Sequence, residues 1–177
     1  DIPAPLIEAG TRRGDLRELV EQVLLRDETP CRCIRCREAG HVERRTGVRP
    51  VIGAVNLVRR EYDASGGREF FLSYEDAEHD ILVAYARLRI PSREAHRREL
   101  ADAAVLRELH VCGPMLPVGA RPVAEWQHRG YGRSLLNLAE RITREELGYA
   151  KLVVISGLGV KAYYRRLGYV EDCLLYT

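Results

Sequence analysis

Three cysteines fall within six residues of this 177-residue chain, as Cys31, Cys33 and Cys36. Thiolates are soft ligands, and a tetrahedral ion such as Zn²⁺ binds four ligands, with sulfur at about 2.3 Å. The spacing therefore predicts a structural zinc site that needs a fourth ligand. Cys112 is the first choice and His41 the alternative, whereas Cys173 is a more distant candidate that is expected to be a small core residue.

A second group of residues could bind phosphate. The run Gln127-His128-Arg129-Gly130-Tyr131-Gly132 precedes a segment with the apolar spacing of a helix. Two glycines one residue apart allow a tight turn in which several N–H groups point into one concavity, and the helix dipole adds positive charge there. Arg129 and Arg133 can supplement that charge. The run predicts a diphosphate site, although two such glycines also occur in plain strand-to-helix turns.

Acid–base chemistry could come from Glu108 and His110, which alternate with Leu109 and Val111 in a predicted strand. If the two apolar residues face the core, Glu108 and His110 share the opposite face. Either side chain could then act as a base or line an acyl pocket. A purely structural role is equally plausible for His110.

Basic charge is concentrated in one part of the chain. Residues 31–60 hold eight Arg against two Glu and carry a charge of +6, whereas the whole chain carries +2. This segment predicts contact with a polyanion such as RNA. A solvated surface is the alternative, because the chain contains 26 Arg and two Lys.

Other classes of protein are disfavoured. No apolar stretch is long enough to span a membrane, and no signal-peptide pattern is present. We therefore expect a cytoplasmic, reducing environment without membrane contact, in which clustered cysteines bind metal rather than form disulfides.

The sequence also predicts the helices and strands that would position these residues. A helix is predicted from Asp15, the N-cap residue of a capping box with Glu18, to a stop at Pro30. The tract 31–50 has no apolar periodicity, so the metal is expected to hold it. Three antiparallel strands are expected at 55–62, 69–74 and 81–90, followed by a strand at 105–111, a helix at 134–147, a strand at 151–155, a helix at 159–167 and a strand at 169–176.

This order predicts an α/β (α+β) domain with a mixed, mostly antiparallel sheet and helices on its faces. We divide the chain into 1–50, the N-terminal helix and the Cys-rich basic segment, and 51–177, the domain that carries the phosphate turn. No internal repeat is apparent.

Four segments, in this order, resemble the GCN5-related acetyltransferases (GNAT) and, among them, the acetyltransferase region of the Elongator catalytic subunit (Elp3) family. They are Arg107–Gly113, Gln127-x-x-Gly130-x-Gly132, Val154–Gly157 and Tyr163–Tyr169. Residues 1–7 and 71–76 are also similar to that family. The likeness therefore extends over nearly the whole chain.

The resemblance implies a GNAT fold and an acetyl-CoA site. It implies that the pantetheine arm lies along the strand end Glu108-Leu109-His110-Val111, and that the diphosphate lies on the turn. The implied cofactor-binding residues there are Gln127, Gly130, Tyr131, Gly132 and Arg133. It further implies that Tyr164 lies near the CoA sulfur, with Tyr163 as its possible partner, so the catalytic candidates are Tyr164, Tyr163, Glu108 and His110.

The Elp3 family combines this domain with a radical-SAM domain, and together they make carboxymethyl-type modifications at C5 of the wobble uridine (U34) of tRNA. Neither the iron–sulfur pattern Cys-x-x-x-Cys-x-x-Cys nor a TIM-barrel repeat is present in this sequence. The resemblance thus implies the acetyl-CoA-binding domain of a tRNA-modifying acyltransferase, with the iron–sulfur cluster and S-adenosylmethionine bound by another domain.

The implied partners are the anticodon region of tRNA, a radical-SAM domain and Elongator-type subunits. Two other functions stay open. One is an N-acetyltransferase acting on a protein lysine or a small amine, and the other is a non-catalytic, zinc-stapled RNA-binding module. The fold alone does not choose among them.

Overall fold

The computed structural model describes residues 14–92, 94, 97–100, 102–113, 129–172 and 175–176. The chain forms two compact units, residues 1–36 and 37–177. The functional division at residue 50 stays a prediction.

The first unit contains helix α1, Leu16–Arg26, which begins after Asp15 as predicted and ends before Pro30. The Asp15 side chain makes no capping hydrogen bond. None of the α1 residues is buried, and Val20 and Val23 of its apolar stripe are 48% and 45% exposed. The helix itself is therefore confirmed, whereas its predicted cap is not formed by the side chain.

The tract 31–50 contains two short helices, α2 (Ile34–Arg37) and α3 (Ala39–Thr46). No helix was predicted in this tract, so both helices were missed. Helix α3 buries only Ala39, Gly40 and Val42, and it ends at Gly47 in the left-handed conformation (φ 75°). Two turns with such small buried side chains are too short to show a helical period in the sequence.

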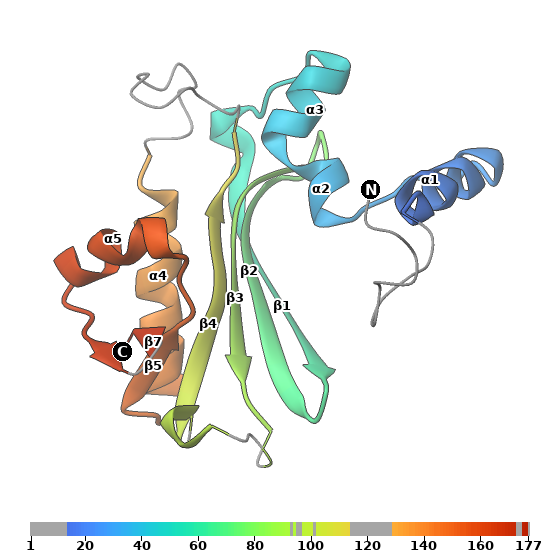
Figure 1. Ribbon diagram of the computed structural model, residues 1–177. Helices are drawn as coiled ribbons and strands as arrows, with labels where there is room; N and C mark the ends of the chain where they lie inside the picture. The colour runs from blue at the N-terminus through green and yellow to red at the C-terminus, as the bar shows by residue number, and fades with distance from the viewer. Residues whose placement is uncertain are drawn as a thin grey trace. The chain divides into compact units, whose positions relative to one another are not determined.

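The second unit is built on one mixed sheet, confirming the prediction (Figure 1). Its strands are β1 (Val55–Ala64), β2 (Gly67–Asp76), β3 (Ile81–Ile90), β4 (Ala103–Val111), β5 (Lys151–Val154), β6 (Glu171–Asp172) and β7 (Leu175–Tyr176). Among the described residues the order is β1-β2-β3-β4-β5-β7-β6. Only the β4–β5 pair is parallel within this set.

The end of the chain differs from the single strand predicted at 169–176. Strands β6 and β7 are two residues each, and they pair with one another in antiparallel fashion. Strand β7 in turn pairs with β5 through Val154 and Tyr176. The sequence at this point contains no Gly, Pro or Asn that would mark the reversal.

Helix α4 (Tyr131–Arg141) covers one face of the sheet and continues into a π-helix, η4 (Ile142–Glu146) (Figure 1). The predicted helix at 134–147 thus begins three residues earlier and changes its winding near the end. The Leu147 N–H donates to the Ile142 carbonyl at 3.0 Å, five residues back. After β5, a 3₁₀ turn at Leu158–Val160 leads into α5 (Lys161–Arg166).

The main hydrophobic core lies between α4 and the sheet. Leu135, Leu136 and Ala139 of α4 are fully buried, together with side chains from β2, β3, β4 and β5. Burying a leucine side chain contributes about 1.5–3 kcal/mol. This packing fixes the height of α4 over the sheet, and thereby the position of the turn at which the helix begins.

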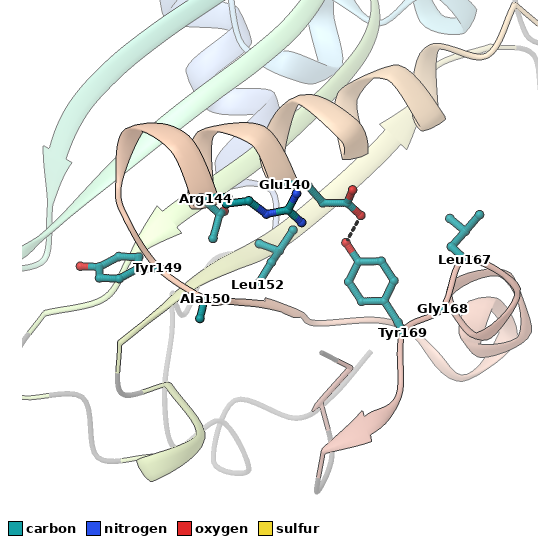
Figure 2. A pocket seen from close by; sticks show the side chains of 9 residues that line it. Glu140, Arg144, Tyr149, Ala150, Leu152, Leu167, Gly168 and Tyr169 are labelled. Carbon is teal, nitrogen blue, oxygen red and sulfur yellow. Dashed lines mark hydrogen bonds between the residues drawn. The ribbon is translucent and has the colours of Figure 1, made fainter.

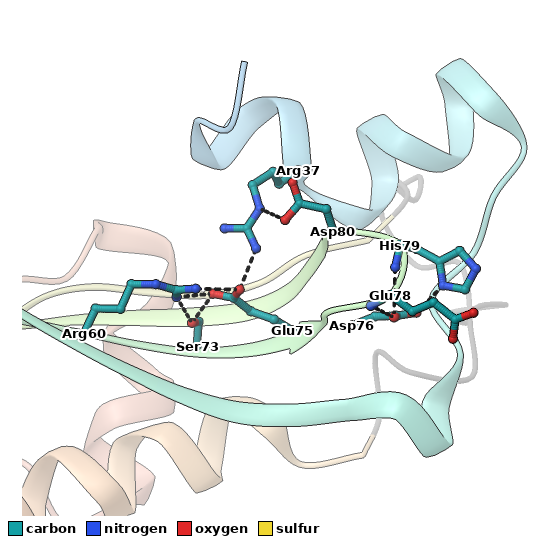
Figure 3. Close-up of polar contacts among 8 residues, drawn as sticks. All are labelled: Arg37, Arg60, Ser73, Glu75, Asp76, Glu78, His79 and Asp80. Atoms are coloured by element: carbon teal, nitrogen blue, oxygen red, sulfur yellow. Dashed lines mark hydrogen bonds and ion pairs between the residues drawn. The ribbon is translucent and has the colours of Figure 1, made fainter. Parts of the chain in front are cut away.

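Buried charges anchor the turn between β2 and β3 (Figure 3). Glu75, 4% exposed, accepts hydrogen bonds from Arg37 and from Arg60, both at 2.5 Å. Arg37 also donates to Asp80 at 2.8 Å. Burial alone would raise the pKa of Glu75, but Arg60, Ser73 and Arg37 lower it to about 2. The carboxylate is therefore charged and holds β1 and Arg37 to this turn.

Candidate functional site at the diverging strands

Strands β4 and β5 are parallel neighbours for only part of their length. They pair from Ala103 with Lys151 to Leu106 with Val154. One further hydrogen bond joins them, from the Ile155 N–H to the Leu106 carbonyl at 3.0 Å. Beyond it, within the described residues, the rest of β4 pairs only with β3. Among the described residues, no strand pairs with the β4 edge that faces β5 where the two strands separate, and this edge is called the open edge below.

A β-bulge marks the point of separation. Arg87 of β3 pairs with Glu108, whereas Leu88 pairs with Leu106, so Arg107 is passed over. A bulge of this kind bends its strand and increases the local twist. We therefore attribute the divergence of β4 from β5 to the extra residue Arg107.

The turn that begins α4 lies against the end of β4. Gly130 is the N-cap residue in the left-handed conformation (φ 75°), and its carbonyl accepts the Ser134 N–H at 2.9 Å. A Cβ on Gly132 would lie 3.3 Å from Cγ2 of Val111. The N–H groups of the first helical turn have no partner within the helix. Hence the glycines bring a donor-rich helix start close to the open strand edge.

Neighbouring side chains fix this turn. The rings of Tyr74 and Tyr131 lie 4.6 Å apart, and the hydroxyls of Tyr74 and Ser134 are 2.7 Å apart. Arg133 donates to Asn137 at 3.1 Å. A groove of about 410 Å³ begins here and runs along α4, lined by Leu57, Gly130, Arg133, Ser134, Asn137, Leu138 and Arg141. Gln127 lies outside the described residues.

Tyr164 is held in an aromatic cluster. Its side chain is 5% exposed, and its ring makes edge-to-face contacts with Tyr163 and Tyr169, at 5.2 and 5.7 Å between centroids. Burial, with a contribution from Tyr163, raises the pKa of Tyr164 to about 12. The phenol is therefore protonated at neutral pH and can donate a proton or hydrogen bond, but cannot act as a base.

Tyr169 has the environment of a core aromatic residue and is 8% exposed. Its hydroxyl donates to Glu140 at 2.7 Å, as the dashed line in Figure 2 shows. This bond closes one side of a hollow of about 240 Å³, lined by Glu140, Thr143, Arg144, Tyr149, Ala150, Leu152, Leu167, Gly168 and Tyr169. The hollow lies beside the second half of α4, away from the turn at Gly130.

Glu108 and His110 share one face of the sheet. Glu108 accepts hydrogen bonds from Arg87 at 2.8 Å and Tyr85 at 3.2 Å. The imidazole of His110 stacks on Tyr85, with 5.1 Å between ring centroids. Leu109, between them in sequence, packs against the main core. The Glu108 carboxylate is thus fixed beside the bulge, whereas the His110 ring is exposed.

A buried carboxylate cluster on this face was not predicted. The Glu69 side chain, 1% exposed, forms ion pairs with Arg87, Arg89 and Arg107. Burial alone would raise the pKa of Glu69, but Arg87, Arg107 and Arg89 lower it below its ordinary value. Alternating arginines at 87 and 89 in a strand are the sequence signal that could have revealed it, because they face the same side.

The three clustered cysteines lie together in the first unit. Their sulfur atoms are all within 4.8 Å of one another. In tetrahedral coordination with Zn–S bonds of 2.3 Å, sulfurs lie about 3.8 Å apart, so the group fits zinc after small side-chain rotations. Arg17 donates to Cys33 and Cys36 at 3.8 and 3.7 Å. Burial alone would raise the pKa of Cys33, but hydrogen bonds from Cys36, Cys31 and Arg17 lower it to about 6, whereas burial and the neighbouring cysteines raise the pKa of Cys36 to about 11.

Cys112 and His41 belong to the second unit. Cys112 is 4% exposed, and its N–H donates to the Val83 carbonyl at 2.8 Å. Burial, followed by the charge of Glu38, raises its thiol pKa to about 12. His41 lies in α3 with Nε2 3.9 Å from the Glu38 carboxylate. The choice of fourth ligand stays a prediction, and Cys173 lies outside the described residues.

Comparisons with known proteins agree with this geometry. Residues 53–169 match the acetyltransferase (GNAT) family. The chain is 50% identical, over 96% of its length, to a tRNA uridine(34) acetyltransferase of Methanocaldococcus jannaschii, of which it covers 31%. It is 49% identical over 97% of its length to Elongator complex protein 3 of Drosophila melanogaster, again covering 31% of that protein.

A solved structure gives the same result. The fold superimposes with a TM-score of 0.80 on an archaeal Elp3 from Methanocaldococcus infernus with an N-terminal deletion. The identity is 45%, and the match covers 99% of this chain and 42% of the other. The chain thus spans about a third of the length of the curated relatives it matches. None of its described helices has the length and apolar character needed to cross a membrane.

Proposed function

Because the chain belongs to the GNAT family of acetyltransferases, we propose that acetyl-CoA binds where β4 and β5 diverge. The observation that carries the proposal is the juxtaposition of two features. One is the open β4 edge beyond the Leu106–Ile155 hydrogen bond, and the other is the glycine turn of α4 packed against Val111. An extended arm with amide groups fits the edge, and a diphosphate fits the turn.

The residues of this chain have distinct roles in the proposal. The backbone of residues 108–111 binds the arm, while Gly130, Tyr131, Gly132 and Arg133, with Gln127, bind the diphosphate. When bound, acetyl-CoA supplies an activated acetyl group as a thioester. Tyr164, protonated at neutral pH, donates a hydrogen bond to the sulfur that leaves. Glu108, fixed by Arg87 and Tyr85, accepts a proton on the side of the acyl acceptor.

We further propose that the acetyl group is used to modify the wobble uridine of a tRNA. The support is the similarity to proteins named tRNA uridine(34) acetyltransferase and Elongator complex protein 3. The basic segment 31–60 would contact the RNA phosphates. The radical chemistry at uridine C5 would need a domain that binds S-adenosylmethionine and an iron–sulfur cluster, in the same chain or a partner, with Elongator-type subunits as further partners and a cytoplasmic location.

Zinc is proposed as a structural ion held by Cys31, Cys33 and Cys36. The support is the mutual distance of the three sulfur atoms and their soft-donor chemistry. Cys112 remains the first choice for the fourth position and His41 the alternative. No step of the acetyl chemistry involves this ion.

The test is acetyl-CoA turnover with and without tRNA. We expect calorimetry to detect acetyl-CoA binding to the isolated chain, and thiol release to increase when tRNA is added. Acetylation of a peptide lysine or a small amine without RNA would instead support the N-acetyltransferase alternative. Binding of tRNA without any affinity for acetyl-CoA would support a non-catalytic RNA-binding module and overturn the proposal.

A further inference from the structure

Ser156 lies directly after the last contact between β4 and β5. Ile155 donates its N–H to Leu106, and the next residue is Ser156, in the sequence Val154-Ile155-Ser156-Gly157. From this point the chain turns into the 3₁₀ segment at 158–160 that precedes α5. Ser156 therefore stands at the apex of the gap, between the bulged strand and the helix that carries Tyr164.

The hydroxyl of Ser156 is buried and has no hydrogen-bond partner among the described residues. In the described part of the chain, the other buried side-chain oxygen without a partner is Oε2 of Glu43, whose second carboxylate oxygen accepts from Arg49 at 2.6 Å. Ser156 has no second polar atom in its side chain to compensate. A buried hydroxyl without a partner costs about 1–3 kcal/mol, and native proteins rarely retain one unless a ligand or water satisfies it.

We propose that the Ser156 hydroxyl hydrogen-bonds an amide of the pantetheine arm of acetyl-CoA at the apex of the gap between β4 and β5. This inference rests on the proposed acetyl-CoA site and adds a specific side-chain contact to it. The arm contains two amide groups, which lose their hydrogen bonds to water when the arm enters the gap. A serine hydroxyl can donate to an amide carbonyl or accept from an amide N–H.

The position explains why the residue is polar although it follows a buried strand. Leu152, Val153 and Val154 of β5 are buried and apolar, as expected for a central parallel strand. Were Ser156 only a continuation of that packing, an alanine would serve without the cost of a buried hydroxyl. The hydroxyl instead lies just after the end of β5, at the point where the gap for the pantetheine arm opens. Ser156 is thus a binding and positioning residue, and the chemical step does not require it.

The experiment compares Ser156→Ala with the wild-type chain in two measurements. Calorimetric titration with acetyl-CoA and with CoA should show both affinities weakened about three- to tenfold, the value of one net hydrogen bond. The ligand-free Tm should stay the same or rise, because the variant removes an unsatisfied buried hydroxyl. A hydroxyl that is satisfied within the fold would give the reverse pattern, a lower Tm and unchanged affinity, and that result would overturn the proposal.

Ser73→Ala is the matched control. The Ser73 hydroxyl is also buried, but it donates to Glu75 at 2.5 Å, within the protein. We expect this variant to have a lower Tm and an unchanged affinity for acetyl-CoA. If the wild-type chain binds no acetyl-CoA, the proposed function itself fails. If the wild-type and Ser156→Ala chains bind it equally, only the assignment of Ser156 fails.

Discussion

The Ile155 N–H donates to the Leu106 carbonyl at 3.0 Å, and this is the last hydrogen bond between β4 and β5 in the described part of the chain. One residue further along β4, the bulge at Arg107 turns the strand away. The separation is therefore built into the backbone and does not depend on a ligand. Glycines at the start of α4 then bring helix N–H groups to the far end of the open edge.

Gly132→Val should weaken acetyl-CoA binding by at least about tenfold, equivalent to about 1.4 kcal/mol. A Cβ alone would lie 3.3 Å from Cγ2 of Val111, and the two further methyl groups would push the helix start away from the strand. Calorimetry measures the affinity. Gly53→Val is the control, because a Cβ there meets nothing within 4 Å. Equal affinities for both variants would contradict the proposed diphosphate site.

Tyr164→Phe should lower acetyl-CoA turnover by about 100-fold, which is typical for loss of a general acid. The ring contacts with Tyr163 and Tyr169 remain, so the Tm and the acetyl-CoA affinity should change little. Thiol release reports the rate. Tyr163→Phe is the matched control, and a similar loss in that variant, with normal turnover in Tyr164→Phe, would assign the role to Tyr163 instead.

Glu69→Gln should lower the free energy of unfolding by about 3–5 kcal/mol, because it leaves three guanidinium groups without their buried counter-ion. Urea denaturation measures the change. Glu61→Gln provides the comparison, since Glu61 pairs with Arg59 and Arg68 at a more exposed position. There we expect a loss below about 1 kcal/mol. A decrease in the free energy of unfolding below about 1 kcal/mol for Glu69→Gln would show that these ion pairs do not stabilise the fold.

Glu75 makes stability depend on acid pH. Its pKa in the folded chain is about 2, against an ordinary value of 4.5. Its contribution to the free energy of unfolding, on the order of 3 kcal/mol, is therefore complete above pH 4.5 and is lost as the pH falls towards 2. Urea denaturation of the wild type and Glu75→Gln should give a difference in the free energy of unfolding that is largest near neutral pH and disappears in acid. A difference that does not depend on pH would contradict the assignment of Glu75 to these ion pairs.

Metal content tests the cysteine cluster. The purified chain should contain about one equivalent of zinc, and Cys33→Ser should reduce it strongly because one of three clustered sulfurs is removed. Elemental analysis measures the zinc, and a thiol reagent counts the free cysteines. Cys112→Ser and His41→Ala, compared with each other, identify the fourth ligand. Zinc-free protein with every thiol reactive would end the metal proposal.

Much of the fold was predictable because long periodic segments dominate it. Both ends of the strand at 81–90 were predicted correctly. The predicted ranges for β1, β2 and β4 were two to four residues shorter than the observed strands. Helix α3 was missed because two turns around Ala39 and Val42 give no detectable period. The reversal at the C-terminus was missed because two-residue strands have no pattern of their own.

The site was predictable where a residue type favours a particular backbone conformation or where strand alternation decides which face a side chain lies on. The glycines at 130 and 132 predicted the turn, and alternation placed Glu108 and His110 on one face. The bulge at Arg107 and the unpaired hydroxyl of Ser156 were not predictable. The bulge depends on which residues of neighbouring strands stand opposite one another, and the unpaired hydroxyl depends on which polar groups surround Ser156 in the fold. A single sequence contains neither the register nor these surroundings.

The π-helical end of α4 has a consequence for how the helix is joined to the sheet. The wide turn from Ile142 to Leu147 contains one residue more than an α-helical turn. Glu146 lies in this turn, and its carboxylate accepts hydrogen bonds from Arg59 of β1 at 2.7 and 2.8 Å. An ion pair therefore ties the end of the helix to the first strand, between residues that are 87 positions apart in the sequence.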